Sequence, residues 1–175
     1  MEPYKIVLLV LILLFFVYFV FFLYVFSHIL NFSKRMKKRL RALDIMLSEK
    51  SIHLLSMKEN YESLGIVFSD ADKASLKELK RLKFEKSTYD SVCYNRAAID
   101  KAEKRLSYIA LTSPVIQTDP INASIRANLE DLDRNFRRCS ALYNSDLIAY
   151  NYWITIPGIR LFVLLFRFHK AKAIG

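Results

Sequence analysis

The chain holds few residues of the types that bind metals or act as nucleophiles, and their spacing favours neither chemistry. The three histidines, His28, His53 and His169, have no partner four positions away, and no Cys-x-x-Cys pair accompanies them. Two cysteines are too few for a disulfide framework. Glycine-rich phosphate loops and nucleophile elbows do not occur in the sequence. We therefore expect no catalytic centre, no bound metal and no cofactor.

Two Tyr-Asn pairs are better candidates for a specific role. Tyr143-Asn144 and Tyr150-Asn151 lie seven positions apart, which is two helical turns, so the tyrosines share one helix face and the asparagines a flanking stripe. Such tyrosines commonly complete a core, while the asparagines bond a neighbouring helix. The alternative is a surface for self-association or for a partner helix.

The basic residues are the second candidate group. The chain has 27 basic and 17 acidic residues, a formal charge of +10, and six cations fall within eight positions: Lys34, Arg35, Lys37, Lys38, Arg39 and Arg41. This cluster sets membrane topology, and it can also contact anionic headgroups at about 1 kcal/mol per cation. Nucleic acid is the alternative ligand, but the aromatic residues needed for base stacking fall on helix seams instead.

The cluster follows a segment that is typical of a membrane anchor. Residues 6–26 are all apolar or tyrosine, and a helix over residues 6–30 would be about 37 Å long, against a hydrocarbon core of about 30 Å. Tyr18 lies deeper in this segment than interfacial aromatics usually do. A cleaved signal peptide would have a core of about 7–15 apolar residues, so we expect the anchor to be retained. The positive-inside rule places residues 1–5 outside and the C-terminal bulk beyond the anchor in the cytoplasm.

A helix seam continues beyond the anchor. Apolar residues recur at alternating spacings of four and three from Met36 to Phe68, and only Lys50 breaks the series. This pattern predicts that the anchor helix runs on into the cytoplasm as the first helix of a bundle, and that it stops near Gly65.

Two further helices are predicted. A weaker stripe indicates a second helix over residues 72–112, which must end before Pro114 because the residue before proline leaves the α region. Asp119-Pro120 is typical of a helix start, and the third helix should reach Trp153. Asp146 is the polar exception on its seam, and we expect Arg96 or Lys86 to be its partner.

The predicted fold class is therefore all-α. Three glycines and four prolines leave few turns, and three seams over residues 31–153 favour an antiparallel bundle that runs up, down and up. Residues 154–175 form a hydrophobic basic tail, which could cover the bundle end, lie in a membrane interface or pair with another chain. Because an up-down-up bundle ends away from the membrane, packing or self-association is favoured over membrane contact.

The third helix and the tail carry a recognisable order of residues: Arg137-Arg138, Tyr143-Asn144, Tyr150-Asn151, Pro157, and an apolar run over 161–168. This order resembles the LemA family of bacterial membrane-anchored helical proteins, and Leu43-Asp44 stands at the family's Ile-Asp. The chain departs from the pattern at Leu40, where the family usually has tryptophan, and in lacking a proline within residues 53–57.

The resemblance implies a helical protein of the bacterial cell membrane without established enzymatic activity, in a family with members implicated in membrane organisation. We therefore expect a single-pass scaffold that contacts helical proteins, lipid headgroups or a second copy of itself. The alternative is a cytoplasmic domain that binds nucleic acid or another polyanion.

Overall fold

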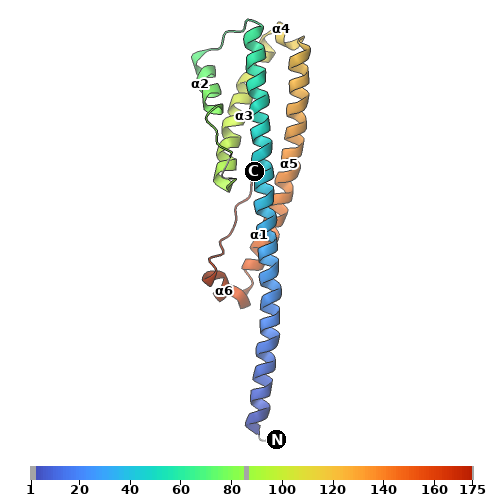
Figure 1. Ribbon diagram of the computed structural model, residues 1–175, viewed down its shortest axis with the longest axis vertical. Coiled ribbons are helices and arrows are strands. Elements are labelled where there is room, and N and C mark those ends of the chain that lie inside the picture. The colour runs from blue at the N-terminus through green and yellow to red at the C-terminus, as the bar shows by residue number, and fades with distance from the viewer. Residues whose placement is uncertain (1–2, 85–86, 175) are drawn as a thin grey trace. The chain divides into compact units, whose positions relative to one another are not determined.

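The computed structural model describes residues 3–84 and 87–174, except for the side chains of residues 161 and 162. The described residues contain helices and no strands, which confirms the all-α fold class. Figure 1 shows the elements in order: α1 (Pro3–Ser63), α2 (Asp70–Leu79), α3 (Tyr89–Thr112), α4 (Pro114–Gln117), α5 (Pro120–Ile154), the 3-10 helix η1 (Pro157–Ile159) and α6 (Arg160–Leu165).

Helix α1 joins the predicted anchor and the predicted first helix in one continuous run of 61 residues. It ends close to the predicted stop, because Gly65 adopts a φ of +79° that other residues rarely take. Its final carbonyls are satisfied by the next turn, where the amide of Ile66 donates to the carbonyl of Tyr61 at 3.0 Å.

The chain forms two compact units. The first unit comprises Met1–Met36 and Asn144–Ala173; the second comprises Lys37–Tyr143 and Ile174–Gly175. Helices α1 and α5 each contribute residues to both units.

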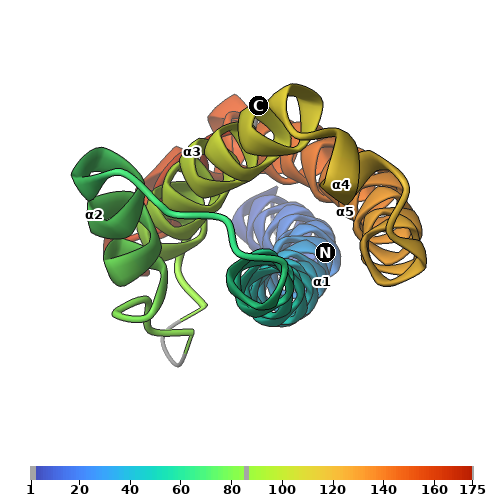
Figure 2. The same ribbon diagram turned by 90° about the horizontal axis from the view of Figure 1, so that it is seen from above.

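The core of the second unit is built by the predicted seams. It buries Leu43, Leu47, Leu54, Met57 and Tyr61 from α1, Val92, Ile99 and Leu106 from α3, and Leu129, Phe136 and Tyr143 from α5. Each large apolar side chain removed from water contributes about 1.5–3 kcal/mol before the entropy of ordering is subtracted. In the second unit α1 lies beside both α3 and α5 (Figures 1 and 2).

Helices α1 and α3 run in the same direction. Asp44 contacts Asn95 at 3.4 Å, and six residues later Lys50 pairs with Glu103 at 2.7 Å, so the contacts advance together along both helices. The prediction that the second helix runs opposite to the first is wrong for α3. The predicted helix over 72–112 is in fact two helices, α2 and α3, and the chain reverses its direction between them (Figure 1).

The physical reason is a second helix start within the predicted stripe. Thr88 caps α3 through a capping box with Ser91, just as Ser69 and Asp72 cap α2. The Asn95 side chain also donates to the carbonyl of Lys83 at 3.0 Å, which holds the connection between the helices.

Helix α5 runs opposite to α1 and begins as predicted. The backbone amide of Asn122 donates to the Asp119 carboxylate at 2.8 Å, which is an N-terminal cap. Hydrogen bonds to that carboxylate, from Asn60 and from the backbone, lower the pKa of Asp119. Tyr61 reaches Asn122 near the start of α5, whereas Arg39 meets Cys139 much later along it. An additional short helix, α4, connects α3 to α5 and was not predicted.

Candidate membrane-contact site

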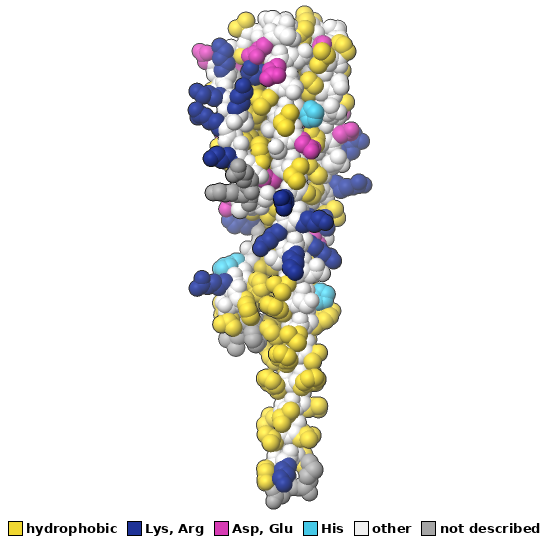
Figure 3. Space-filling view, in the orientation of Figure 1, with side chains coloured by type: hydrophobic (Ala, Val, Ile, Leu, Met, Phe, Trp, Pro, Cys, Tyr) yellow, Lys and Arg dark blue, Asp and Glu magenta, His cyan; other side chains and the backbone are white. Residues whose placement is uncertain are grey.

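The N-terminal part of α1 is apolar on every face and packs against little. Among the described residues α1 is the one helix long and apolar enough to cross a membrane, and none of its most apolar stretch is buried. The exposed fraction reaches 70% at Phe15, and hydrophobic side chains cover this part of the chain in Figure 3. A contiguous apolar surface of this extent is typical of contact with lipid or with another protein.

The tail packs alongside this apolar segment within the first unit. The rings of Phe166 and Phe168 lie 5.1 Å and 6.2 Å from the ring of Phe26. The tail was expected at the end of the bundle that points away from the anchor, and this expectation is wrong. The split of the predicted second helix adds one reversal, so α5 leads back along α1.

Tyr18, the deep tyrosine of the anchor, has a partner in the tail. Its hydroxyl donates to the backbone carbonyl of Gly158. Pro157 opens η1 at this point, and Ile156 before it is extended, as a residue preceding proline should be. In an apolar surrounding an unpaired backbone carbonyl is costly, and the Tyr18 hydroxyl gives the Gly158 carbonyl a donor.

Aromatic stacking joins the end of α5 to α1. Trp153, the chain's single tryptophan, stacks on His28 with ring centroids 4.9 Å apart and an interplanar angle of 11°. Tyr24 meets the same indole edge-on at 6.0 Å. His28 therefore lies in an aromatic cluster.

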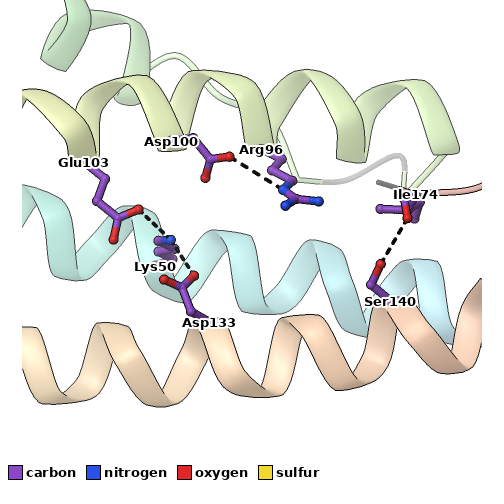
Figure 4. A network of polar contacts seen from close by, with 7 residues as sticks. All are labelled: Lys50, Arg96, Asp100, Glu103, Asp133, Ser140 and Ile174. Carbon is purple, nitrogen blue, oxygen red and sulfur yellow. Dashed lines mark hydrogen bonds and ion pairs between the residues drawn. The ribbon is translucent and has the colours of Figure 1, made fainter.

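Asn151 holds the returning tail through both atoms of its amide. Its Nδ2 donates to the carbonyl of Ala171 at 3.2 Å, and its Oδ1 accepts from the amide of Ala171 at 3.0 Å. Farther along, Ile174 is buried in the second unit, where its carbonyl accepts from Ser140 at 3.4 Å (Figure 4).

The other motif residues have simpler surroundings. Tyr143 and Tyr150 are both buried, and burial raises the pKa of the Tyr143 phenol. Asn144 is half-buried and engaged in polar contact. Arg137 and Arg138 are exposed.

The basic cluster is largely open to solvent. Lys34, Arg35, Lys37, Lys38 and Arg41 are exposed, and Arg39 is half-buried. The tail adds exposed cations at Arg160, Arg167, Lys170 and Lys172.

The second unit contains a charged cluster of a different kind. Lys50 is only 5% exposed and pairs with Glu103 at 2.7 Å and Asp133 at 2.5 Å (Figure 4). Burial alone would lower the pKa of Lys50, but hydrogen bonds and the charges of both carboxylates outweigh it and raise that pKa. The cluster borders a cavity of about 240 Å³. The ion pairs of Lys50 join α1 to α3 and to α5, and we interpret this charged cluster as structural.

Arg96 lies beside this cluster. Its guanidinium pairs with Asp100 at 3.6 Å and lies 4.9 Å from the ring centroid of Phe136. Asp146 is buried and has polar contacts; its other predicted partner, Lys86, lies outside the described residues.

Several of these roles were not predicted from the sequence. The one signal for Lys50 was its interruption of an apolar seam, and the one signal for Tyr18 was its depth. Asp44, which is 1% exposed and accepts from Ser87 at 3.0 Å, gave no signal beyond its place in the Leu43-Asp44 motif.

No family model, curated protein or solved structure matches this chain. Within residues 3–84 and 87–174 no group of three or more His, Cys, Asp and Glu side chains is arranged to hold a metal ion. The tail and the apolar part of α1 belong to one compact unit.

Proposed function

We propose that this chain is a single-pass membrane protein that acts as a helical scaffold on the cytoplasmic face, without catalysis of its own. The observation that carries the proposal is the apolar segment of α1, none of whose most apolar stretch is buried. In water this surface would drive association, whereas in a bilayer it needs no partner, since the helix satisfies its own backbone groups.

The charges support the orientation. Lys5 is the one basic side chain ahead of the segment, and the six cations at 34–41 follow it. Under the positive-inside rule this asymmetry places the second unit in the cytoplasm.

The second unit supplies the scaffold in this proposal. We propose that α1, α3 and α5 act there as one three-helix bundle, with α3 parallel and α5 antiparallel to α1. The LemA resemblance remains a prediction; its motif residues Tyr150, Asn151 and Pro157 lie where α5 and the tail meet the anchor. A homo-oligomer or a helical partner would use the exposed faces of the bundle.

The experiment is membrane fractionation of the full chain in a bacterial host. The wild-type protein should stay in the membrane through an alkaline carbonate wash, keep its full mass and expose its C-terminal end to protease only from the cytoplasmic side. A Leu13→Arg/Phe16→Arg variant places two charges at the segment's centre, each costing about 2.5–3.5 kcal/mol, and should move to the soluble fraction. The neutral control Leu13→Ala/Phe16→Ala should remain. Carbonate release of the wild type, or loss of the segment by cleavage, would overturn the proposal.

Polyanion binding is the second candidate, favoured by the exposed cations Lys37, Lys38 and Arg41. It has less support, because the six cations at 34–41 directly follow the apolar segment of α1. Tight binding of the full chain to oligonucleotides of any sequence, with no preference for anionic vesicles, would favour it.

A further inference from the structure

The tail lines an open cavity of about 500 Å³ within the first unit. Its walls come from the end of α5, from η1 and α6, and from the returning segment after α6. Ile154, Val163, Leu164 and Phe168 supply apolar surface to it. Arg160 and Lys170 also line it and are both exposed.

The two cations of the cavity, Arg160 and Lys170, have no acidic partner within residues 3–84 and 87–174. The first unit as a whole is poor in acids, with Glu2 and Asp146 against seven basic residues: Lys5, Lys34, Arg35, Arg160, Arg167, Lys170 and Lys172. The cavity therefore combines an apolar wall with a positive rim.

The cavity also lies beside the apolar segment of α1. Gly158, which follows the lining residue Pro157, accepts from Tyr18, and Phe168 in the wall contacts Phe26. Tyr18 and Phe26 are eight residues apart, about 12 Å along the helix. If α1 crosses a bilayer, the cavity faces the acyl chains and headgroups of the cytoplasmic leaflet.

We propose that this cavity binds one anionic phospholipid, with its phosphate at Arg160 and Lys170 and an acyl chain along Val163, Leu164 and Phe168. The proposal rests on the membrane function above and adds a ligand to it. A guanidinium and an ammonium suit a phosphate, and the apolar wall suits a chain. The volume lies within the range of small-ligand pockets and holds a headgroup with the first part of one chain. An acidic peptide would fit the rim but would leave the apolar wall without a partner.

The test uses the full-length protein in neutral detergent micelles that contain a small fraction of phosphatidylglycerol or phosphatidylcholine. Native mass spectrometry counts the lipids retained per chain, and the fluorescence of Trp153, next to Ile154 in the wall, gives the affinity. We expect one phosphatidylglycerol per chain and no retained phosphatidylcholine. An Arg160→Gln/Lys170→Gln variant should bind phosphatidylglycerol about 30-fold more weakly, for two lost cations.

The matched control is Arg167→Asn/Lys172→Gln, which removes the same charge from the tail outside the cavity. Asparagine is chosen at Arg167 because the φ of +53° there suits it. This control should keep its affinity within about threefold, since a dilute anionic lipid in neutral micelles creates little surface potential. Circular dichroism of both variants checks that the helices persist.

Equal weakening in both double variants would overturn the proposal, since it would mean general attraction between charges. Competition by glycerol 3-phosphate or inorganic phosphate at the same concentrations would also overturn it, because the acyl chain would then be dispensable. Failure of the proposed function is distinguishable, since it appears as carbonate release of the wild type. A chain that stays in the membrane but retains no phosphatidylglycerol refutes the lipid site alone.

Discussion

The two units use the same two helices, α1 and α5, and treat their surfaces in opposite ways. In the first unit the apolar side chains of α1 from Ile6 to Phe21 are exposed, and basic residues greatly outnumber acidic ones. In the second unit the apolar side chains turn inward, and carboxylates and cations are interspersed along the chain. The solvent around a helix determines which of its faces can be apolar: a helix in lipid can be apolar on every face, whereas a helix at the surface of a water-soluble bundle must be amphipathic.

Polar groups inside the two units also have different partners. In the first unit Tyr18 and Asn151 bond backbone groups of the tail, at Gly158 and Ala171. In the second unit the buried Lys50 bonds side chains of two other helices. We infer that Tyr18 and Asn151 satisfy the backbone of a short irregular segment, while Lys50 fixes how three helices are joined.

The largest expected effect comes from the Lys50 cluster. Lys50→Ala leaves Glu103 and Asp133 facing each other without a cation. Removing one partner of a buried pair costs about 3–5 kcal/mol, and we expect about 3 kcal/mol because both carboxylates are partly exposed. Denaturant unfolding of the full chain in detergent, followed by circular dichroism, measures this loss.

The control removes the whole cluster. Lys50→Met/Glu103→Gln/Asp133→Asn leaves no unpaired charge and should recover most of the lost stability. If Lys50→Ala is as stable as the wild type, the cluster does not join the three helices.

Alkaline pH should lower the stability of the second unit, because Lys50 loses the charge that pairs with Glu103 and Asp133. The folded-state pKa of Lys50 lies above its ordinary value of 10.5. A group whose pKa is raised on folding contributes its full stabilisation at pH values below its unfolded-state pKa. That contribution to the free energy of unfolding is lost as the pH rises through the folded-state pKa. Burial also raises the pKa of Tyr61 and Tyr143, which adds a loss of the same sign.

The unfolding midpoint of the wild type should therefore hold steady up to about pH 10 and decrease as the pH rises above the ordinary values of 10.0 for tyrosine and 10.5 for lysine. The triple variant keeps both tyrosines but lacks Lys50, so it should lose less over this range. Identical curves for the two proteins would contradict the role given to Lys50.

A smaller effect is expected where Asn151 holds the tail. Asn151→Ala removes two hydrogen bonds to the Ala171 backbone, worth about 0.5–1.5 kcal/mol each. Hydrogen exchange at the Ala171 amide should become faster, with little change in the second unit. Asn151→Asp keeps the acceptor for that amide and should give an intermediate rate. Unchanged exchange in Asn151→Ala would mean that other contacts hold the tail.

The smallest effect is expected at Tyr18. Tyr18→Phe removes the donor to the Gly158 carbonyl, and hydrogen bonds within membranes average about 0.6 kcal/mol. Hydrogen exchange of residues 157–165 should increase a few-fold. Tyr24→Phe is the matched control, because Tyr24 contributes its ring to the stack on Trp153. Equal effects in both variants would show that the Tyr18 hydroxyl has no special role.

The sequence predicted the parts of the fold that depend on local chemistry. The run of α1, the stop at Gly65 and the cap at Asp119 all follow from helix period and end signals. The break between α2 and α3 was missed because the stripe through Leu79, Leu82 and Tyr89 keeps a helical spacing across it. The Thr88 capping box that marks the restart uses Ser91, a weaker signal than the glutamate that usually completes one.

That single error displaced the tail. The prediction missed the turn between α2 and α3. With one turn too few, the third predicted helix ran away from the anchor, and residues 154–175 were placed at the wrong end of the predicted bundle. The long-range contacts of Tyr18, Asn151 and Lys50 could not be predicted either, because each joins positions at least 20 residues apart. Their residue types were visible in the sequence, and their partners were not.

The most direct test of the central claim, that α1 and the tail share the membrane, is the depth of Trp153. The full chain is reconstituted in bilayers that contain lipids brominated near the headgroup or near the chain end, and quenching of its single tryptophan is compared with quenching by aqueous iodide. Because Trp153 stacks on Tyr24 and His28 near the edge of the apolar segment, headgroup-proximal bromine should quench most and iodide least. Strong quenching by iodide with none by either brominated lipid would contradict the account.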